Sequence, residues 1–558
     1  MFSVQALQSC CMHTRDGVRL DADVYVPEGN GPFPVLLMRQ PYGRAIASTI
    51  VYAHPRWYAA HGYIVVIQDV RGRGTSEGTF ALFTHEVADG EDAVKWAAQL
   101  PKSDGQVGMY GFSYQGMTQL YAAQAQPAEL KAIAPAMTGY HLYEDWAYEN
   151  GALCFQLGLT WAIQLAAETA RIEGNAKTYQ QLVAAAKNLP LFDTVPACPE
   201  VLKGVDSFFH DWVAHPLPTD YWQNLTPQMT GVDLPTLHVG GWFDPYLRGD
   251  LRLYQEMKSR GDHLHYLCIG PWGHIPWGRK VGTVDFGFEA MSFVDQLQID
   301  WFDHVLKEKP LFVEALPVCA FEMGRNQWRR LSCWPANGPE TATHGVKTYF
   351  LESNGLSNIR GDSGCLLEDA DNFERVDVVV HDPWNPAPAL GGHCSIPAGM
   401  FERTAIDARG DVLTYTSFRM KAEMRVMGVV ELVCAITATT PSYDLCAVLS
   451  RVCGGDRGKS EQVYNLTQGY CRINSVGPVS APQAIMLKLH PTCFNLMPGE
   501  ALRLSLSAAC FPAYLVNPGT GAQPNEARMI DAQIITLKIS LGGKDGTRIN
   551  LPIVNSDD

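Results

Sequence analysis

No stretch of this 558-residue chain approaches the ~20 consecutive apolar residues that a helix needs to span a bilayer. Its first twenty residues contain no basic segment followed by a sustained apolar run, which argues against a secretory signal peptide. Basic residues are scarce as well, because 43 Lys and Arg are outnumbered by 58 Asp and Glu, and the formal net charge is −15. A nucleic-acid-binding face would need the opposite balance. We therefore expect a cytoplasmic protein without membrane or nucleic-acid partners.

The motifs that would bind a metal, a nucleotide or a redox partner are also missing. The 15 cysteines are odd in number and scattered, with no C-x-x-C pair, so we expect reduced and mostly buried thiols. VRGRGTSEG departs from the dinucleotide-binding glycine spacing, and CGGDRGKS has Cys453 where a phosphate-binding loop begins with glycine. His263 and His265 could share one face of a strand but have no apparent third ligand. The sequence predicts neither a metal nor a cofactor.

The order of apolar and amphipathic segments predicts the architecture. FPVLLM, YIVVIQD, QVGMYG and LKAIAPA are short, solidly apolar runs separated by helical patterns, which is typical of a parallel sheet covered by helices. Helical patterns dominate residues 141–232, and buried-strand patterns resume over 233–315. From residue 316 to 558 many short strands are separated by Gly, Pro and Asn, which favours a jelly-roll β-sandwich. The fold class is therefore α/β, with residues 1–140 and 233–315 forming a sheet domain, a helical insertion between them, and a C-terminal sandwich.

Ser113 lies in YGFSYQGMTQ, between a buried strand and an Ala-rich helix. This is the context of the nucleophile elbow of α/β-hydrolases, G-x-S-x-G, although Gln115 occupies the place of the second glycine, which follows only at Gly116. A serine at a helix start is also a common N-cap. Local sequence alone leaves both interpretations open.

The rest of a catalytic triad follows in the order that this fold uses, Ser, Asp, His. Asp244 comes just after the strand PTLHV, and His274 just after the strand HYLCI. The amide of Tyr114, directly after the serine, is a candidate oxyanion donor. No glycine run follows the strand FPVLLM to supply a second donor, but Tyr42 lies there in RQPYGR. The four side chains and one amide predict acyl transfer through a serine nucleophile.

Six motifs then become recognisable: RQPYGR, QDVRGRGTSEGTF, DGEDAVKWAAQLP, GMYGFSYQGMTQ, GGWFDPY and GPWGH. Together with HDPWNPAPALGG and DVLTYTS further on, they resemble the cocaine-esterase-like hydrolases, relatives of the X-prolyl dipeptidyl peptidases and α-amino-acid ester hydrolases. The family pattern is G-x-S-Y-x-G, so Gln115 is no defect. The resemblance implies an α/β-hydrolase domain with a helical cap and a jelly roll. It also implies Ser113 as nucleophile, His274 as general base, Asp244 as its orienting acid, and Tyr42 beside the Tyr114 amide as oxyanion donors.

The expected substrate is a small ester, amide or short peptide, and a homo-oligomer is possible. We expect aromatic residues to line its pocket: Trp146, Trp242, Phe243 and Tyr246. An aminopeptidase acting after proline is an alternative and would need an acid for the substrate amine, for which Glu144, Asp145 and Glu149 are available. A catalytically idle carbohydrate-binding protein or scaffold is a further alternative, since jelly rolls often bind sugars.

Overall fold

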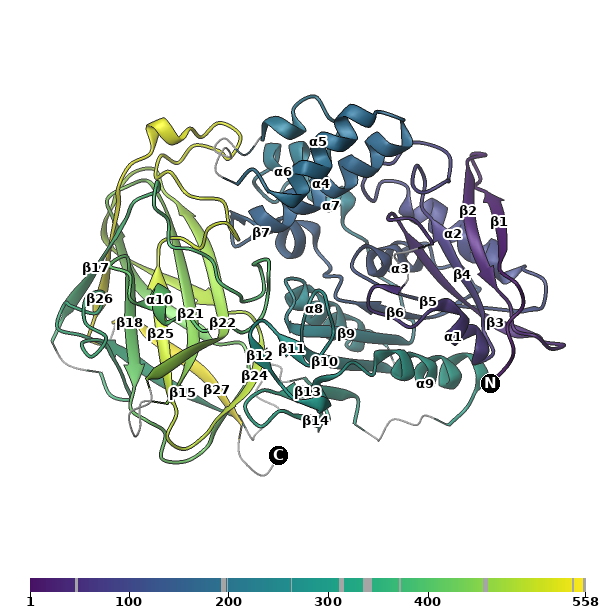
Figure 1. Ribbon diagram of the computed structural model, residues 1–558. Helices are drawn as coiled ribbons and strands as arrows, with labels where there is room; N and C mark the ends of the chain where they lie inside the picture. Colours follow the sequence, from purple (N-terminus) through teal and green to yellow (C-terminus); the bar gives the residue numbers. More distant parts are fainter. Residues whose placement is uncertain are drawn as a thin grey trace.

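The structure is a computed structural model, and it describes residues 1–45, 49–191, 197, 199–261, 263–310, 316–334, 344–370, 373–454, 460–543 and 546–554. A sheet domain with helices on both faces occupies one side of the molecule, and a β-sandwich occupies the other (Figure 1). A group of helices bridges the two along one edge.

The sheet domain is built on a ten-stranded sheet. In spatial order its strands are β1 (Gln8–His13), β2 (Arg19–Tyr25), β4 (Ile64–Asp69), β3 (Phe33–Gln40), β5 (Ser103–Phe112), β6 (Leu130–Ala136), β9 (Thr236–Phe243), β10 (His265–Gly273), β13 (Val318–Glu322) and β14 (Gln327–Leu331). The strands from β4 to β13 run parallel to one another, and those at the two ends are antiparallel. The central strands are buried on both faces, which explains their continuous apolar sequences.

Helices cover both faces of this sheet. Residues of α2 (Glu86–Ala98) and α3 (Tyr114–Gln124) pack in one core cluster, and residues of α1 (Pro55–Ala60) and α9 (Val294–Lys307) pack in another. The remaining helix, α8 (Leu247–Lys258), follows β9 and contributes to the first cluster. This is the layered arrangement that the alternating strand and helix patterns predict.

The sheet extends further along the chain than the sequence indicates. We expected the sandwich to begin at residue 316, yet β13 pairs parallel with β10, and β14 continues the same sheet. Between β10 and α9 the chain forms three short elements: β11 (Lys280–Val281), β12 (Val284–Asp285) and η4 (Phe288–Ala290). It then continues through α9 to β13. An isolated five-residue strand has the same pattern in a sheet or a sandwich, so only the pairing partner distinguishes them.

The inserted helices form a cap over the carboxyl ends of the parallel strands (Figure 1). The elements are η2 (Leu142–Ala147, a π-helix), the short strands β7 (Tyr148–Glu149) and β8 (Ala152–Leu153), α4 (Phe155–Ile172), α5 (Ala176–Lys187), η3 (Glu200–Leu202), α6 (Phe208–Ala214) and α7 (Asp220–Leu225). The apolar side of α4 packs in the same core cluster as α2 and α3. This shared core fixes the cap to the sheet domain.

The C-terminal part is a β-sandwich, as expected from its short strands. Its elements are β15 (His344–Glu352), β16 (Cys365–Leu367), β17 (Arg375–His381), α10 (Thr404–Asp407), β18 (Val412–Ser417), β19 (Met424–Gly428), β20 (Glu431–Ala438), β21 (Ser442–Gly454), β22 (Glu461–Asn474), β23 (Val479–Lys488), β24 (Thr492–Leu496), β25 (Ala501–Ser507), η5 (Met529–Asp531), β26 (Ile535–Leu541) and β27 (Arg548–Val554). Pairing is almost entirely antiparallel. β20 alternates half-buried and buried residues, which is the period of a strand with one face toward a core.

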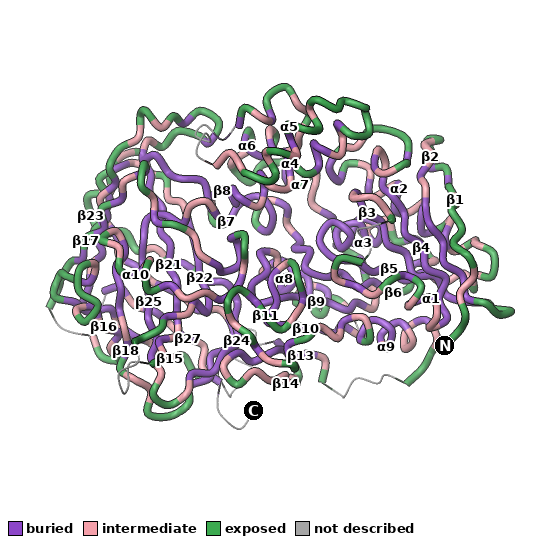
Figure 2. The backbone as a smooth tube through the Cα atoms, viewed as in Figure 1, coloured by how far each residue is buried: buried purple, intermediate pink, exposed green. Residues whose placement is uncertain are grey.

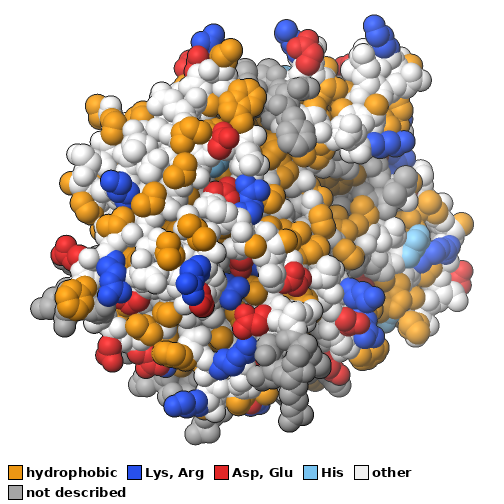
Figure 3. Space-filling model, turned by 60° about the vertical axis from the view of Figure 1, so that its left-hand side comes forward, with side chains coloured by type: hydrophobic (Ala, Val, Ile, Leu, Met, Phe, Trp, Pro, Cys, Tyr) orange, Lys and Arg blue, Asp and Glu red, His pale blue; other side chains and the backbone are white. Residues whose placement is uncertain are grey.

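Buried backbone runs through the strands of both β-rich parts and through the inner cap helices, while exposed backbone is concentrated in the loops (Figure 2). On the face shown in Figure 3, acidic and basic side chains are interspersed, so that face has no large patch of a single charge.

Among the described helices, none is long and apolar enough to cross a membrane. The cysteines that the structure describes are all free, and most of them are buried.

Candidate active site

Ser113 occupies a sharp turn between β5 and α3. Its backbone dihedrals are φ 59° and ψ −127°, a conformation that residues other than glycine rarely adopt. The turn is fixed to the neighbouring strand β6, because the Ser113 amide donates to the carbonyl of Ala136 across 2.9 Å. Strain concentrated in a single residue at the end of a buried strand is typical of a nucleophile elbow.

Two glycines make this turn sterically possible. A Cβ at Gly111 would stand 2.5 Å from Cβ of Gln115, and one at Gly116 would stand 2.6 Å from the side chain of Thr138. Gln115 is accommodated because its side chain turns back and accepts the Phe112 amide at 3.3 Å. The turn therefore requires glycine at the position two residues before the serine and at the position three residues after it.

A carboxylic acid that the sequence analysis missed supports the elbow from α8. Asp250 Oδ1 accepts the amides of Thr138 and Gly139 at 3.0 and 2.9 Å, and the Thr138 hydroxyl donates to the Ser113 carbonyl at 2.8 Å. Burial, together with the nearby charge of Asp244, raises the pKa of Asp250 well above its ordinary value. Asp250 lies six residues after Asp244, in the first turn of α8, and the sequence offers no motif that would have identified it.

Asp244 and His274, which the sequence predicts as acid and base, lie in contact. Asp244 follows β9 and is fully buried, and its Oδ2 lies 2.6 Å from Nδ1 of His274. Its other oxygen accepts the Tyr246 amide at 2.9 Å, which fixes the carboxylate plane. His274 follows β10 and is partly exposed. A carboxylate bound to Nδ1 leaves Nε2 of the imidazole free to act as a base.

Ser113 and His274 open into one cavity of about 380 Å³ between the sheet domain and the cap. No hydrogen bond joins these two side chains among the described contacts. Such pairs are often long in unliganded enzymes and shorten when substrate binds.

Tyr42 lies in the same cavity, supported by a residue from the cap. The indole N–H of Trp161, on α4, donates to the Tyr42 hydroxyl oxygen across 3.1 Å. Burial raises the pKa of Tyr42 to about 12, although the bond from Trp161, the charge of Arg73 and a hydrogen bond with Ser113 oppose the shift. The phenol therefore stays protonated at neutral pH and can donate its own proton toward Ser113. The sequence offered no signal for Trp161, because 119 residues separate it from Tyr42.

Tyr114 is the first residue of α3, where backbone amides have no acceptor within the helix. Its amide therefore stands at the helix N-terminus beside Ser113. Its side chain points elsewhere, since the hydroxyl donates to Oε1 of Glu86 at 2.8 Å and Glu86 pairs with buried Arg39 at 2.6 Å. These bonds anchor α3 to the sheet, so the side chain has a structural role and only the amide remains a candidate oxyanion donor.

Aromatic side chains dominate the cavity wall. Trp146 stacks on Tyr246 with ring centroids 4.4 Å apart, and Tyr246 meets the His274 ring edge-on at 5.1 Å. The remaining wall comes from the cap, from loops of the sheet domain and, through Ile396, from the sandwich. The full lining is Tyr42, Ile50, Phe112, Ser113, Gln115, Trp146, Leu157, Gly158, Thr160, Trp161, Gln164, Trp212, Tyr246, His274, Ile275 and Ile396.

Two aromatic residues expected in the pocket lie outside it, which corrects the sequence prediction. The indole of Trp242 donates to the Phe321 carbonyl at 2.7 Å and packs against Trp334. Phe243 belongs to the same buried core cluster, and neither residue lines the cavity. Both are still within β9, and the neighbouring strands β10 and β13 bury this end of the sheet. The chain enters the site only at Asp244.

The three acids considered as anchors for a substrate amine are engaged elsewhere. Glu149 is buried against Arg248, His393 and Tyr514 at 2.6, 2.8 and 2.5 Å. Asp145 accepts the amides of Tyr140 and His141, and exposed Glu144 pairs with Arg252. None of the three lines the cavity.

The described residues contain no cluster of side chains that could hold a metal ion. His263, which the sequence analysis considered as a metal ligand, lies 3.8 Å from Asp233.

Comparison with known proteins gives consistent matches over the whole chain. Residues 16–276 match the X-Pro dipeptidyl-peptidase (S15) family, and residues 314–543 match the X-Pro dipeptidyl-peptidase C-terminal non-catalytic domain. A cocaine esterase from Rhodococcus sp. (strain MB1 Bresler) is 29% identical, with 97% of each chain covered.

Solved structures show the same fold. An aminopeptidase from a marine sediment archaeon, Thaumarchaeota archaeon, has a TM-score of 0.82 at 21% identity, over 99% of this chain and 97% of that one. An α-amino-acid ester hydrolase has a TM-score of 0.80 at 20% identity with the same coverage. The architecture expected from the sequence, an α/β-hydrolase domain followed by a β-sandwich, is confirmed. The chain is a serine hydrolase that combines the catalytic and C-terminal domains of the X-Pro dipeptidyl-peptidases and is similar over nearly its whole length to a cocaine esterase.

Proposed function

We propose that this enzyme hydrolyses esters of apolar or aromatic carboxylic acids through an acyl-enzyme. Ser113 Oγ attacks the acyl carbon while Nε2 of His274 takes its proton, and Asp244 stabilises the resulting imidazolium. The Tyr42 hydroxyl and the Tyr114 amide donate to the tetrahedral oxyanion. His274 then protonates the departing alcohol, and a water molecule, deprotonated by the same imidazole, releases the acid.

The observation that carries this proposal is the chemistry of the cavity wall. Around Ser113 it consists of aromatic and aliphatic side chains with a few neutral polar groups, and no carboxylate is among the described residues that line it. An apolar acyl group gains free energy by leaving water for such a wall. An ammonium in the same place would lose its hydration without gaining a partner.

The absence of a free acid also bears on the aminopeptidase alternative. A peptidase that removes N-terminal dipeptides needs a counter-charge for the substrate's amine. Glu144, Asp145 and Glu149 are held by arginines, backbone amides or a histidine. Freeing one of them would break contacts within the cap or contacts that join the cap to the sheet domain or the sandwich, which favours the esterase.

Covalent labelling together with turnover tests the proposal. A fluorophosphonate should label the wild-type protein once, at Ser113, and should not label Ser113→Ala. Phenyl phenylacetate should be hydrolysed, and Tyr42→Phe should lower kcat by about 10²–10³ with a smaller change in KM, because an oxyanion donor acts mainly on the transition state. A protein that neither accepts the label nor hydrolyses the ester would instead be the idle scaffold.

A further inference from the structure

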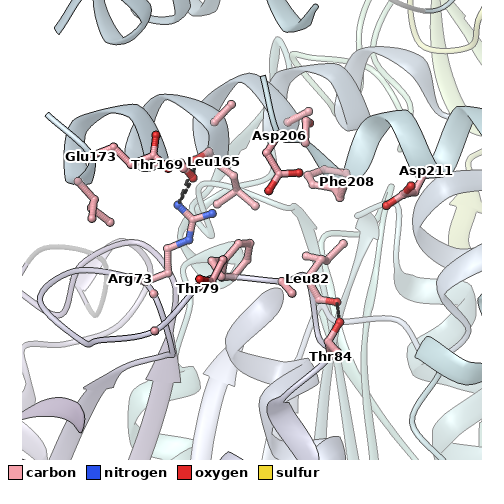
Figure 4. Close-up of a pocket in the computed structure, with 18 of the residues that line it drawn as sticks. Arg73, Thr79, Leu82, Thr84, Leu165, Thr169, Glu173, Asp206, Phe208 and Asp211 are labelled. Carbon is pink, nitrogen blue, oxygen red and sulfur yellow. Dashed lines mark hydrogen bonds between the residues drawn. The ribbon is translucent and has the colours of Figure 1, made fainter. Parts of the chain in front are cut away.

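A second cavity lies beside the cap helix α4, which lines it through other residues than those that line the active-site cavity. Figure 4 shows the residues around this second cavity. It has a volume of about 330 Å³ and is enclosed by the loop after β4, residues 72–84, and by the helices α4, α6 and α7. Phe208 lines it, and the ring of Phe208 packs 4.7 Å from that of Trp161, which lines the active-site cavity. The two cavities are separated there by this aromatic pair. We call the second one the Arg73 cavity.

Arg73 enters this cavity as a charged group without a counter-ion. Only 1% of the residue is exposed, and its guanidinium packs over the Phe80 ring at 3.7 Å. Nη1 donates to the Leu165 carbonyl at 3.0 Å and to the Thr169 hydroxyl at 3.1 Å. Nε is buried without a hydrogen-bond partner. Within the described part of the chain no carboxylate lies within ion-pair distance of Arg73, and Glu168 and Asp206 act on its charge only from farther away. Figure 4 shows the guanidinium standing between the loop and α4, with one edge turned to the open space.

A buried guanidinium in this state is unusual. Arginine is almost never fully buried unless it is paired, because an isolated charge loses its hydration. Burial lowers the pKa of Arg73 to about 10, which still leaves it protonated at neutral pH. The other buried arginine of this domain, Arg39, has the expected partner in Glu86 at 2.6 Å. Arg73 therefore lacks an anion that the cavity in front of it has room to hold.

The rim of the cavity carries charge of the opposite sign. Glu173, Asp206 and Asp211 are exposed at its edge, and none of them forms an ion pair among the described residues. Asp206 extends from the cap into the same space as the guanidinium (Figure 4). A simple anion would be repelled by these acids, and a simple cation would be repelled by Arg73. A molecule with a carboxylate at one end and an ammonium at the other satisfies both.

Between the charged groups the wall is apolar, with contributions from Leu82, Ala162, Leu165, Ala166 and Leu225. We propose that the Arg73 cavity binds a free α-amino acid with an apolar side chain. Its carboxylate pairs with the Arg73 guanidinium, its ammonium faces Asp206, and its side chain packs on the aliphatic wall. The guanidinium fork suits a carboxylate, because two parallel N–H groups can meet its two oxygens. The site is distinct from the catalytic cavity and does not depend on the ester chemistry proposed above.

Calorimetric titration with three matched compounds tests the charge requirement. L-phenylalanine should bind saturably, while 3-phenylpropionate, which lacks the amine, and phenethylamine, which lacks the carboxylate, should bind at least tenfold more weakly. The titration is repeated on protein whose Ser113 has been blocked with a fluorophosphonate. Undiminished binding there places the ligand outside the catalytic cavity, and loss of binding overturns the proposal. Absence of saturable binding by L-phenylalanine to the unblocked enzyme also overturns it.

Variants test the residues. Arg73→Met should raise the Kd for L-phenylalanine at least tenfold, and Asp206→Asn should raise it several-fold. Asp220→Asn is the matched control, since it removes an exposed acid from α7 that does not line the cavity, and it should leave the Kd unchanged. Arg73 also ties the loop to α4, so the fold of Arg73→Met is checked by circular dichroism. If that variant does not fold, Asp206→Asn decides: an unchanged Kd contradicts the proposal.

Discussion

The hydrogen bond of 3.1 Å from Trp161 to the Tyr42 hydroxyl links a cap helix to the proposed oxyanion donor. Because Trp161 is the donor, the oxygen of Tyr42 is occupied as an acceptor and its proton is directed toward the reacting carbonyl. Trp161→Phe should therefore lower kcat by about tenfold, the equivalent of one net hydrogen bond of ~1–1.5 kcal/mol. The decrease should be smaller than that of Tyr42→Phe.

Trp212→Phe is the control for this prediction. Trp212 lines the same cavity, but its indole nitrogen has no hydrogen-bond partner in the described structure. The substitution should change KM through lost contact area and leave kcat within about twofold. Equal effects of the two variants on kcat would show that the hydrogen bond from Trp161 to Tyr42 does not contribute to catalysis.

The backbone strain at Ser113 gives a prediction about stability. Its φ of 59° with ψ of −127° suits glycine better than any residue with a Cβ. Ser113→Gly should therefore be more stable than Ser113→Ala by about 1 kcal/mol, since ~1–3 kcal/mol of strain is relieved and part is returned by the greater entropy of the unfolded glycine chain. Both variants should be inactive. Denaturant unfolding measures the difference, and a more stable alanine variant would mean that the turn is not strained.

The parts of this site that could be predicted from sequence are those set by local chain geometry. Ser113, Asp244 and His274 each follow an apolar strand, and the carboxyl ends of parallel strands meet at one edge of a sheet. The structure brings Asp244 and His274 into contact there and opens Ser113 into the same cavity as His274.

Contacts between distant segments could not be predicted in the same way. Trp242 and Phe243 stand next to Asp244 in sequence, but the width of the sheet beyond β9 decides that they are core residues. Trp161 reaches Tyr42 only because α4 packs across the sheet edge. Glu149 has the sequence pattern of an exposed acid, yet it is neutralised by residues of the sheet domain and the sandwich, 99 or more positions away along the chain.

Gly116 tests the steric account of the elbow. A methyl group there would lie 2.6 Å from the Thr138 side chain, whose hydroxyl holds the Ser113 carbonyl. Gly116→Ala should cost ~1–3 kcal/mol of stability, as overpacking of a tight interior does, and should lower kcat by displacing the nucleophile. Gly410→Ala is the control, because a Cβ at Gly410 meets nothing within 4 Å. A Gly116→Ala enzyme with normal kcat would contradict this account.

The buried cluster around Glu149 predicts a pH dependence of stability. Burial alone would raise the pKa of Glu149, but the charges of Arg248 and His393 and the bonds from His393 and Tyr514 lower it from 4.5 to about 2. A carboxyl whose pKa is lower in the folded state contributes stability above its unfolded pKa and loses it as the pH falls through its folded value. The contribution should therefore be complete above pH 4.5 and should disappear between pH 4.5 and about 2.

Glu149→Gln removes this contribution. It should destabilise the protein by ~1–3 kcal/mol at pH 7, because half-buried Arg248 and buried His393 lose a charged partner, and should flatten the acid limb of the stability curve. Glu144→Gln, which removes an exposed pair with Arg252, should cost no more than ~1 kcal/mol. Urea unfolding from pH 7 to pH 3 measures both. A parallel acid limb in Glu149→Gln and wild type would show that Glu149 does not titrate in this range.

The final prediction concerns the acyl group. Methyl phenylacetate and the methyl ester of phenylglycine differ only by an amino group, so their kcat/KM ratio reports how the cavity treats an ammonium. The wall offers Trp146, Trp161 and Tyr246 to the aromatic ring, whereas its described residues offer no carboxylate to the amine. Measured below pH ~7, where an α-amino group is protonated, the phenylacetate should be preferred at least tenfold.

A single substitution should reduce that preference. Gln164 lines the cavity from α4, and Gln164→Glu places a carboxylate there with almost no change of shape. Because a desolvated ammonium would then have a counter-charge, kcat/KM for the phenylglycine ester should rise several-fold while that for the phenylacetate falls or stays constant. A wild-type enzyme that already favours the amino ester would require an acid near the acyl group. Glu144, Asp145 and Glu149 would then be the residues to replace one at a time, since each would first have to leave the partners that hold it.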